Sequence, residues 1–129
     1  MYRHLLLGVV FSLGLAACAT AADMGPAKTG QTALGPVLTD AKGMTLYIFD
    51  KDTMPGKSVC NGKCAENWPP LKADAAAKAM GNWTVIARDD GSKQWAYKGK
   101  PLYGWVKDQK PGDTTGDGFL NGAWHVAKP

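Results

Sequence analysis

Short runs of β-branched and aromatic residues, separated by turn residues, dominate the chain after residue 33. This pattern predicts strands at 36–40, 44–50, 83–88, 94–98, 102–106 and 124–127. The Asp-Asp-Gly-Ser turn at 89–92 favours a hairpin between two of them, because glycine supplies a positive φ. One helix is predicted at 71–80, which is rich in alanine, has Asp74 near its start and is followed by Gly81. The expected fold is a mainly β, small antiparallel domain, a sandwich or meander, with one short helix.

The second half of that pattern repeats the first. Residues 43–68 align with residues 99–124 without a gap at an offset of 56, and nine of the 26 pairs are identical. Most matches are glycine, proline or aromatic residues, which set backbone shape rather than chemistry. The sequence therefore predicts two pseudo-equivalent repeat units, about 35–70 and 91–127, with the helix between them.

The N-terminus has the features of a secretion signal. A short basic start is followed by the apolar run Leu5–Leu15, which is too short to span a bilayer as a mature helix. Leu15-Ala16-Ala17-Cys18 resembles the lipobox of bacterial lipoproteins, which implies a signal peptide at 1–17 and a lipid on Cys18. Ordinary cleavage at an Ala-x-Ala site is the alternative. Under the first interpretation, residues 18–33 form a flexible tether and residues 34–129 the domain, and Ala19 after the cysteine implies the outer membrane.

The chain is basic, with a formal net charge of +4 at pH 7. Five lysines gather in the second half: Lys93, Lys98, Lys100, Lys107 and Lys110. Such a cluster suits an anionic lipid or another envelope polyanion, although a merely solvated lysine face gives the same pattern. No motif supports nucleic-acid binding, and a secreted protein does not meet nucleic acid routinely.

Two of the three cysteines lie close together. Cys60 and Cys64 are separated by three residues and are expected to form a disulfide in an oxidising compartment. A redox-active pair or a metal site is less favoured, because the spacing is not Cys-x-x-Cys and further ligands are lacking nearby. The repeat supports a structural bridge, since the equivalent positions carry Gly116 and Leu120.

Both repeat units carry one motif at the end of a predicted strand. Its residues are Tyr47, Phe49 and Asp52 in the first unit and Tyr103, Trp105 and Asp108 in the second. With Cys60-x-Gly62-x-Cys64, the following Trp-Pro-Pro and the closing Trp124-His125-Val126, the chain resembles the predicted bacterial lipoproteins that carry a Yx(FWY)xxD motif, also described as secreted repeats of unknown function. The resemblance implies a β-rich envelope domain and no established activity.

The motif aromatics and carboxylates have two interpretations. In the first, the aromatics form a core and the carboxylates fix the loops that follow the two motif strands, here called the exit loops; in the second, both line two related ligand sites. The first is favoured, because aromatic side chains bury the most area in a small domain. His125 is a weak candidate for a metal ligand or, with methionine, for copper. The segment 113–118 resembles part of a calcium loop but breaks its alternation of ligands.

No catalytic constellation stands out. Ser58 and Ser92 lie in no Gly-x-Ser-x-Gly elbow, and one histidine, His125, follows the signal segment. The expected function is that of a non-catalytic, lipid-anchored envelope module without a cofactor, which binds an envelope protein or polyanion. The alternative is a periplasmic redox or copper protein that uses Cys60 and Cys64, or His125 with methionine.

Overall fold

The computed structural model describes residues 25–129; the predicted signal peptide, Cys18 and the first part of the tether lie outside this range. The protein is mainly β, as the sequence predicts. The strands are β1 (Lys28–Thr32), β2 (Gly35–Thr39), β3 (Tyr47–Phe49), β4 (Lys72–Ala73), β5 (Trp83–Ala87), β6 (Lys93–Tyr97), β7 (Lys100–Pro101) and β8 (Trp124–Val126). The helices are α1 (Lys63–Asn67) and α2 (Phe119–Gly122).

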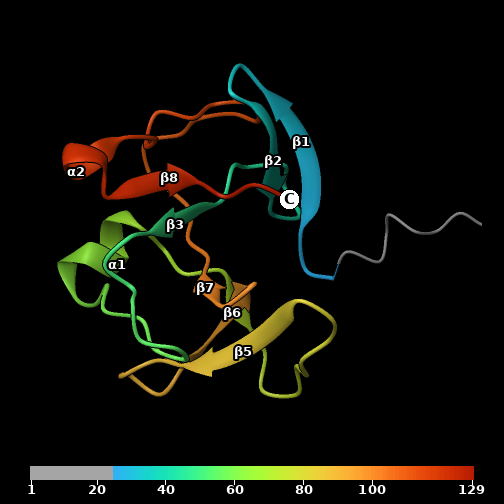
Figure 1. Ribbon diagram of the computed structural model, residues 1–129, viewed down its shortest axis with the longest axis vertical. Coiled ribbons are helices and arrows are strands. Elements are labelled where there is room, and N and C mark those ends of the chain that lie inside the picture. The colour runs from blue at the N-terminus through green and yellow to red at the C-terminus, as the bar shows by residue number, and fades with distance from the viewer. Residues whose placement is uncertain (1–24) are drawn as a thin grey trace, which may run out of the picture.

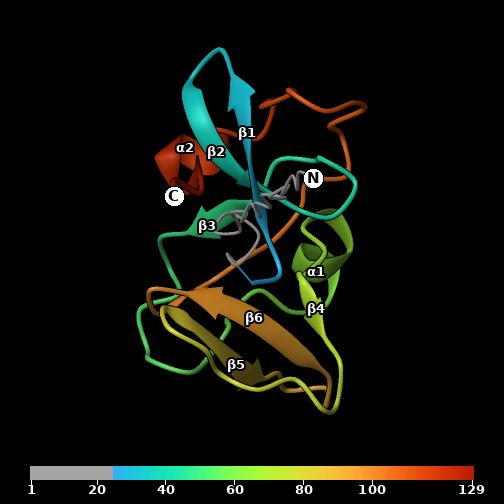
Figure 2. The same ribbon diagram turned by 90° about the vertical axis from the view of Figure 1, so that its right-hand side faces the viewer.

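All strand pairs are antiparallel and form three small sheets. β1 pairs with β2, β3 pairs with β8, and β6 lies between β4 and β5 with β7 also on β6. The hairpins β1–β2 and β5–β6 lie at opposite ends of the long axis, with β3 between them (Figures 1 and 2). The predicted hairpin turn at 89–92 is present, since the N–H of Arg88 donates to the carbonyl of Ser92 at 2.8 Å.

The tether prediction is wrong for its last part. Residues 28–32 form β1, which pairs residue for residue with β2, from Lys28 opposite Thr39 to Thr32 opposite Gly35. Most side chains of β1 are exposed, so the segment lacks the alternation that identifies a half-buried strand. β2 supplies the buried residues of this pair, with Val37 and Leu38 fully covered. The ordered domain thus includes residues that composition alone assigns to a linker.

The helix predicted at 71–80 is also wrong. Lys72 and Ala73 pair with β6, and the Asp74 carboxylate closes a turn by accepting the N–H of Ala76 at 3.1 Å. Only Ala73 is buried in this stretch, and a helix of one or two turns without a buried face is not stable in water. The two short helices lie instead inside the repeat units, 56 residues apart at their first residues.

The predicted strand at 102–106 is reduced to single bridges at Tyr103, opposite Tyr47 and Pro70. In the first unit, β3 continues past this point, with Ile48 opposite His125. The second unit places Pro69 where the first has His125, and proline has no N–H to donate. One bond remains there, from the N–H of Gly104 to the carbonyl of Pro69 at 2.8 Å.

Two buried clusters form the core, on opposite faces of the central strands. Tyr47 and Phe49 point into one cluster, and Leu46 points into the other. The first cluster is mostly aromatic and includes Trp68 and Trp124. This aromatic cluster contains most of the predicted motif.

Candidate functional site

The two repeat units meet at their equivalent tyrosines. Tyr47 and Tyr103 are both 0% exposed, and their main chains exchange two hydrogen bonds, of 2.8 and 3.0 Å. Since each residue is the counterpart of the other at the offset of 56, this pair lies where a twofold axis between the units would pass. Both units therefore build a single centre.

The motif side chains cross from one unit to the other. The Tyr47 hydroxyl donates to Asp108 Oδ2 at 2.6 Å, and the Tyr103 hydroxyl donates to Asp52 Oδ2 at the same distance. The second oxygen of each carboxylate holds its own exit loop: Asp52 Oδ1 accepts the N–H of Val59, and Asp108 Oδ1 accepts that of Thr115. Each aspartate thus fixes one loop and the tyrosine of the other unit.

Burial shifts the ionisation of these groups. It raises the pKa of Tyr47 and of Tyr103 well above the ordinary value, and the hydrogen bond to an aspartate raises each further. Burial also raises the pKa of Asp52, partly offset by the hydrogen bonds from Tyr103 and Val59. Both phenols are therefore neutral hydrogen-bond donors over the physiological pH range.

Four aromatic rings form a continuous stack beside this centre. Phe49 lies 4.1 Å from Trp124, Trp124 lies 3.7 Å from Trp68, and Trp68 lies 3.9 Å from Trp105, measured between ring centroids. The outer contacts are equivalent under the repeat, and the central pair is nearly parallel at 3°. Each motif aromatic therefore stacks on the tryptophan of the other unit. The stack is part of the core, with every member 8% exposed or less.

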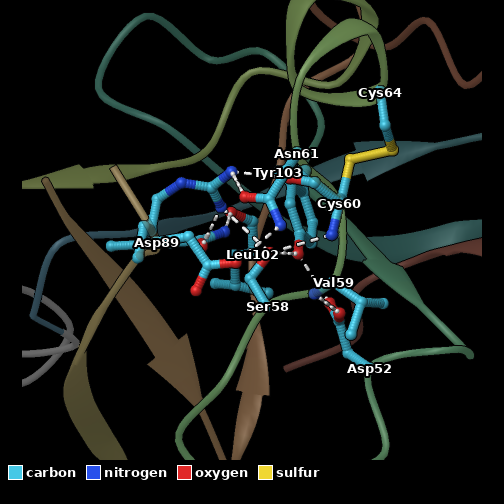
Figure 3. Close-up of a disulfide and its surroundings, with 11 residues drawn as sticks. Asp52, Ser58, Val59, Cys60, Asn61, Cys64, Asp89, Leu102 and Tyr103 are labelled. Carbon is cyan, nitrogen blue, oxygen red and sulfur yellow. Dashed lines mark hydrogen bonds between the residues drawn. A yellow bond between two sulfur atoms is a disulfide. The ribbon is translucent and has the colours of Figure 1, made fainter. Parts of the chain in front are cut away.

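A disulfide joins Cys60 to Cys64 beside this centre, as the sequence predicts (Figure 3). Cys60 is fully buried, whereas Cys64 is half-buried. The main chain of Cys60 is held on both sides: its N–H donates to Ser58 Oγ at 3.2 Å, and its carbonyl accepts from Arg88 Nη2 at 2.6 Å. The bridged loop is therefore anchored to the hairpin that carries Arg88.

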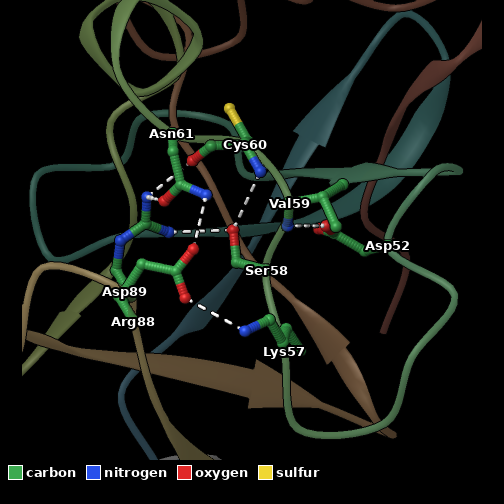
Figure 4. A network of polar contacts seen from close by, with 8 residues as sticks. All are labelled: Asp52, Lys57, Ser58, Val59, Cys60, Asn61, Arg88 and Asp89. Atoms are coloured by element: carbon green, nitrogen blue, oxygen red, sulfur yellow. Dashed lines mark hydrogen bonds and ion pairs between the residues drawn. The ribbon is translucent and has the colours of Figure 1, made fainter.

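Arg88 is a buried cation, 6% exposed, in the polar network that Figure 4 shows. Its Nη1 donates to Ser58 Oγ at 3.0 Å and to Gln94 Oε1 at 2.7 Å. Ser58 Oγ lies 2.6 Å from the Tyr103 hydroxyl, which donates to Asp52. These bonds form one chain from the guanidinium to the buried carboxylate, and the charge of Arg88 lowers the pKa of Asp52 against the larger effect of burial.

Sequence reasoning missed Arg88 and Gln94 as part of the site. A signal was present, because Arg88 follows Ile86 at the two-residue period of β5, and Ile86 is buried. The same period places the arginine on the inner face. An inward-facing arginine at the end of a strand is a cue for a buried polar network.

The outer edge of the network is exposed. Asp89 accepts from Lys57 Nζ at 3.0 Å and from Asn61 Nδ2 at 3.2 Å. The ion pair is about half exposed on both sides, so it contributes little to stability. This ion pair connects the exit loop of the first unit to the β5–β6 turn (Figure 4).

The remaining candidates lie apart from this centre. His125 Nε2 lies 2.8 Å from Asp50 Oδ2 in a partly exposed pair. Within residues 25–129, no group of three or more histidine, cysteine or acidic side chains is arranged to hold a metal ion. In the segment resembling a calcium loop, Asp113 accepts main-chain N–H groups of Gln109 and Lys110, and Asp117 accepts that of Val126.

Comparison with known proteins agrees with the repeat. The model of a family described as a secreted repeat of unknown function matches residues 28–72 and again residues 84–128. The two matches begin 56 residues apart, which is the offset of the repeat. No curated protein and no solved structure matches the chain.

The matched segments make up more than half of the chain, and the family description indicates an extracellular or envelope location. Neither helix found between residues 25 and 129 has the length and apolar character that crossing a bilayer requires. The chain belongs to the family of secreted repeats of unknown function.

Proposed function

We propose that the protein is a non-catalytic module of the bacterial cell envelope, anchored by lipid on Cys18, that presents its surface to an envelope partner. One observation carries this proposal: both motif tyrosines are 0% exposed, and each donates its hydroxyl to the aspartate of the other unit. The duplicated motif is thereby engaged inside the molecule. Binding is therefore left to the outer surface of the scaffold.

The polar groups of the centre suit a structural role better than a catalytic one. Ser58 is 2% exposed and already bonded to Arg88, Cys60 and Tyr103. A nucleophilic serine needs a base within reach, and the serine network contains no histidine. His125 lies on β8, where it pairs with Asp50.

The lipid anchor is tested on the full-length protein expressed in a bacterium. We expect incorporation of an alkyne-labelled fatty acid, abolished by Cys18→Ser. Cys64→Ser is the matched control, because it removes a cysteine and leaves the proposed lipid attachment intact. Equal labelling of the Cys18→Ser protein would contradict the anchor, and an unlabelled protein cleaved after Ala21 would support ordinary secretion.

The partner is proposed to be an envelope protein or an anionic envelope polymer, and not nucleic acid. The basic composition, +4 at pH 7 for the whole chain with Arg3 of the predicted signal peptide included, favours an anionic surface. Crosslinking in intact cells, followed by mass spectrometry, is expected to recover one such partner with the wild-type protein. Recovery that does not fall as salt rises from 50 mM to 500 mM would contradict an electrostatic partner, since exposed charges are largely screened at the higher salt.

A redox or copper-binding role is the alternative, and the half-buried Cys64 is the observation that favours it. We expect a Cys60–Cys64 reduction potential below about −300 mV, which is the range of structural disulfides. We also expect copper titration to give no stoichiometric shift in melting temperature. A potential near the cellular redox poise, or one tight copper equivalent lost in His125→Ala, would favour the alternative.

A further inference from the structure

A groove of about 230 Å³ lies between the β6–β7 turn and the residues that follow β8. Leu102, Val126 and Ala127 line it and are each 5% exposed or less, so they form an apolar floor. Ile48 and Tyr97 complete the apolar lining. The groove borders the Asp52–Arg88 network at Leu102, whose carbonyl accepts a hydrogen bond from Gln94 Nε2 at 2.8 Å.

The rim of the groove is cationic. Lys98, Lys100 and Lys128 line it and are exposed, and no acidic residue is among the lining residues. Across residues 25–129 the ion pairs are Lys57–Asp89, Lys110–Asp113 and His125–Asp50, so none of the three rim lysines forms an ion pair.

The contacts of two rim lysines leave their charge available. Lys98 Nζ lies 5.2 Å from the centre of the Tyr97 ring, and Lys128 Nζ donates to the carbonyl of Leu34 at 2.9 Å. Neither partner carries a negative charge. The backbone holds Lys98 at φ 51°, in the left-handed region that residues with a side chain seldom adopt.

We propose that this groove binds a free single-chain anionic amphiphile, with the alkyl chain on the apolar floor and the acidic head among the rim lysines. Two features determine this class: an apolar floor selects a hydrocarbon, and three lysines without carboxylate partners select an anion. The volume lies below the range of about 300–1,000 Å³ typical of drug-sized ligands, so it takes one chain rather than a two-chain lipid.

This inference goes beyond the macromolecular partner proposed above, because it adds a small-molecule ligand at a site of its own. Its test does not depend on the lipid anchor, so the two can fail separately. The Cys18→Ser protein is secreted and purified after removal of its signal segment at an Ala-x-Ala site, because without lipid and without the apolar run Leu5–Leu15 it needs no detergent. Decanoate is titrated at pH 7 and low salt by calorimetry, with decanol as the uncharged analogue and acetate as the anion without a chain.

We expect decanoate to bind in a 1:1 ratio at least tenfold more tightly than decanol, and acetate to give no saturable binding. In a series of lengthening fatty acids, affinity is expected to rise about fourfold per methylene until the groove is full and then to level off. Equal affinity for decanoate and decanol would overturn the proposal. Binding to phosphatidylglycerol vesicles without binding to monomeric decanoate would overturn it in favour of a bilayer surface.

Charge variants locate the site. Lys98→Gln with Lys100→Gln is expected to weaken decanoate binding at least tenfold and to leave decanol unchanged. Lys51→Gln with Lys107→Gln removes the same charge elsewhere and is expected to change decanoate affinity less than twofold. If the first pair lowers the melting temperature, Lys100→Gln with Lys128→Gln repeats the test. An equal loss in both pairs would show that net charge, and not the groove, attracts the anion.

Discussion

The two repeat units share one scaffold and anchor their loops in different ways. In both units the tyrosine hydroxyl donates a hydrogen bond of 2.6 Å to the aspartate of the other unit. In both, the motif aromatic ring stacks on the tryptophan of the other unit. The loop of the first unit is also held by a disulfide and by the buried Arg88. In the second unit the positions equivalent to Cys60 and Cys64 carry Gly116 and Leu120. Arg88 comes from the second unit, and its counterpart in the first unit is Thr32.

Close packing takes the place of the disulfide in the second unit. A Cβ atom on Gly116 would lie 2.6 Å from Trp68 Cη2, so only glycine allows this approach. The N–H of Gly116 donates directly to the Tyr47 hydroxyl at 3.2 Å, whereas that of Cys60 reaches Tyr103 through Ser58. Phe119 then covers Trp105, with ring centres 4.8 Å apart. The comparison teaches that this scaffold tolerates more than one way of closing its exit loop.

The hairpins show a second difference. Lys28 pairs with Thr39 in the first unit, and Thr84 pairs with Ala96 in the second, which gives offsets of 56 and 57 for the two strands. The second hairpin turn is thus one residue longer, and the following turn is one residue shorter. Insertion and deletion in turns leave the central tyrosines in register, because turns absorb length changes at little cost.

The largest expected effect comes from removing a ring of the central stack. Trp68→Ala and Trp124→Ala are each expected to lower the free energy of unfolding by about 3–5 kcal/mol, measured by urea denaturation. Because the two rings are counterparts, the losses should agree within about 1 kcal/mol. If either alanine variant fails to fold, Trp68→Phe and Trp124→Phe provide the same comparison. A loss below 1 kcal/mol in one variant alone would break the symmetry of the core.

The buried cation Arg88, which the second unit supplies to the loop of the first unit, should come next. Arg88→Met is expected to cost about 2–4 kcal/mol, because it leaves Gln94 Oε1 and the carbonyl of Cys60 without their donor. At the equivalent position, Thr32→Val removes two bonds of a partly exposed turn, from Thr32 Oγ1 to the carbonyl of Gly35 and from the N–H of Leu34 to Thr32 Oγ1, and should cost less than about 1 kcal/mol. Equal losses in thermal denaturation would show that the network adds nothing specific to the first unit.

The packing of the second unit is tested by adding one methyl group. Gly116→Ala is expected to destabilise by about 1–3 kcal/mol, because the new Cβ overlaps the ring of Trp68. Gly104→Ala is the matched control, since the nearest atom to its Cβ is 3.9 Å away and its φ is not positive. A destabilised control together with an unchanged Gly116→Ala protein would contradict the role of close packing.

The smallest effect is the dependence of stability on alkaline pH. Unfolded tyrosine ionises near pH 10, whereas burial raises the pKa of Tyr47 and Tyr103 in the folded state. Below pH 10 both states hold the proton; above it the unfolded state loses the proton first, so stability falls as pH rises. At pH 11 the loss should be about 1.4 kcal/mol per tyrosine. Urea denaturation at pH 9 and 11 measures it, and each Tyr→Phe variant should show a smaller drop than wild type. Equal drops would contradict the shift.

The sequence predicted the strands that bury one face and the repeat that relates them. Tyr47, Phe49 and their counterparts follow the two-residue period, which is a local property of a pleated strand. The sequence failed at β1 and at residues 71–80, because β1 is ordered by its partner strand and an alanine-rich stretch without a buried face does not remain helical. The disulfide was predicted from the spacing of Cys60 and Cys64 and from the oxidising compartment that the secretion signal implies. The buried Arg88 was not identified.

By itself, the amino-acid sequence determined a secreted, duplicated β domain, because composition and period are properties of short segments. Only the tertiary structure decided that each tyrosine serves the other unit's aspartate, that four rings stack across the repeat, and that three lysines surround one apolar groove. Those arrangements join residues that are distant in the chain. Such contacts depend on how strands pair and pack, which no local pattern specifies.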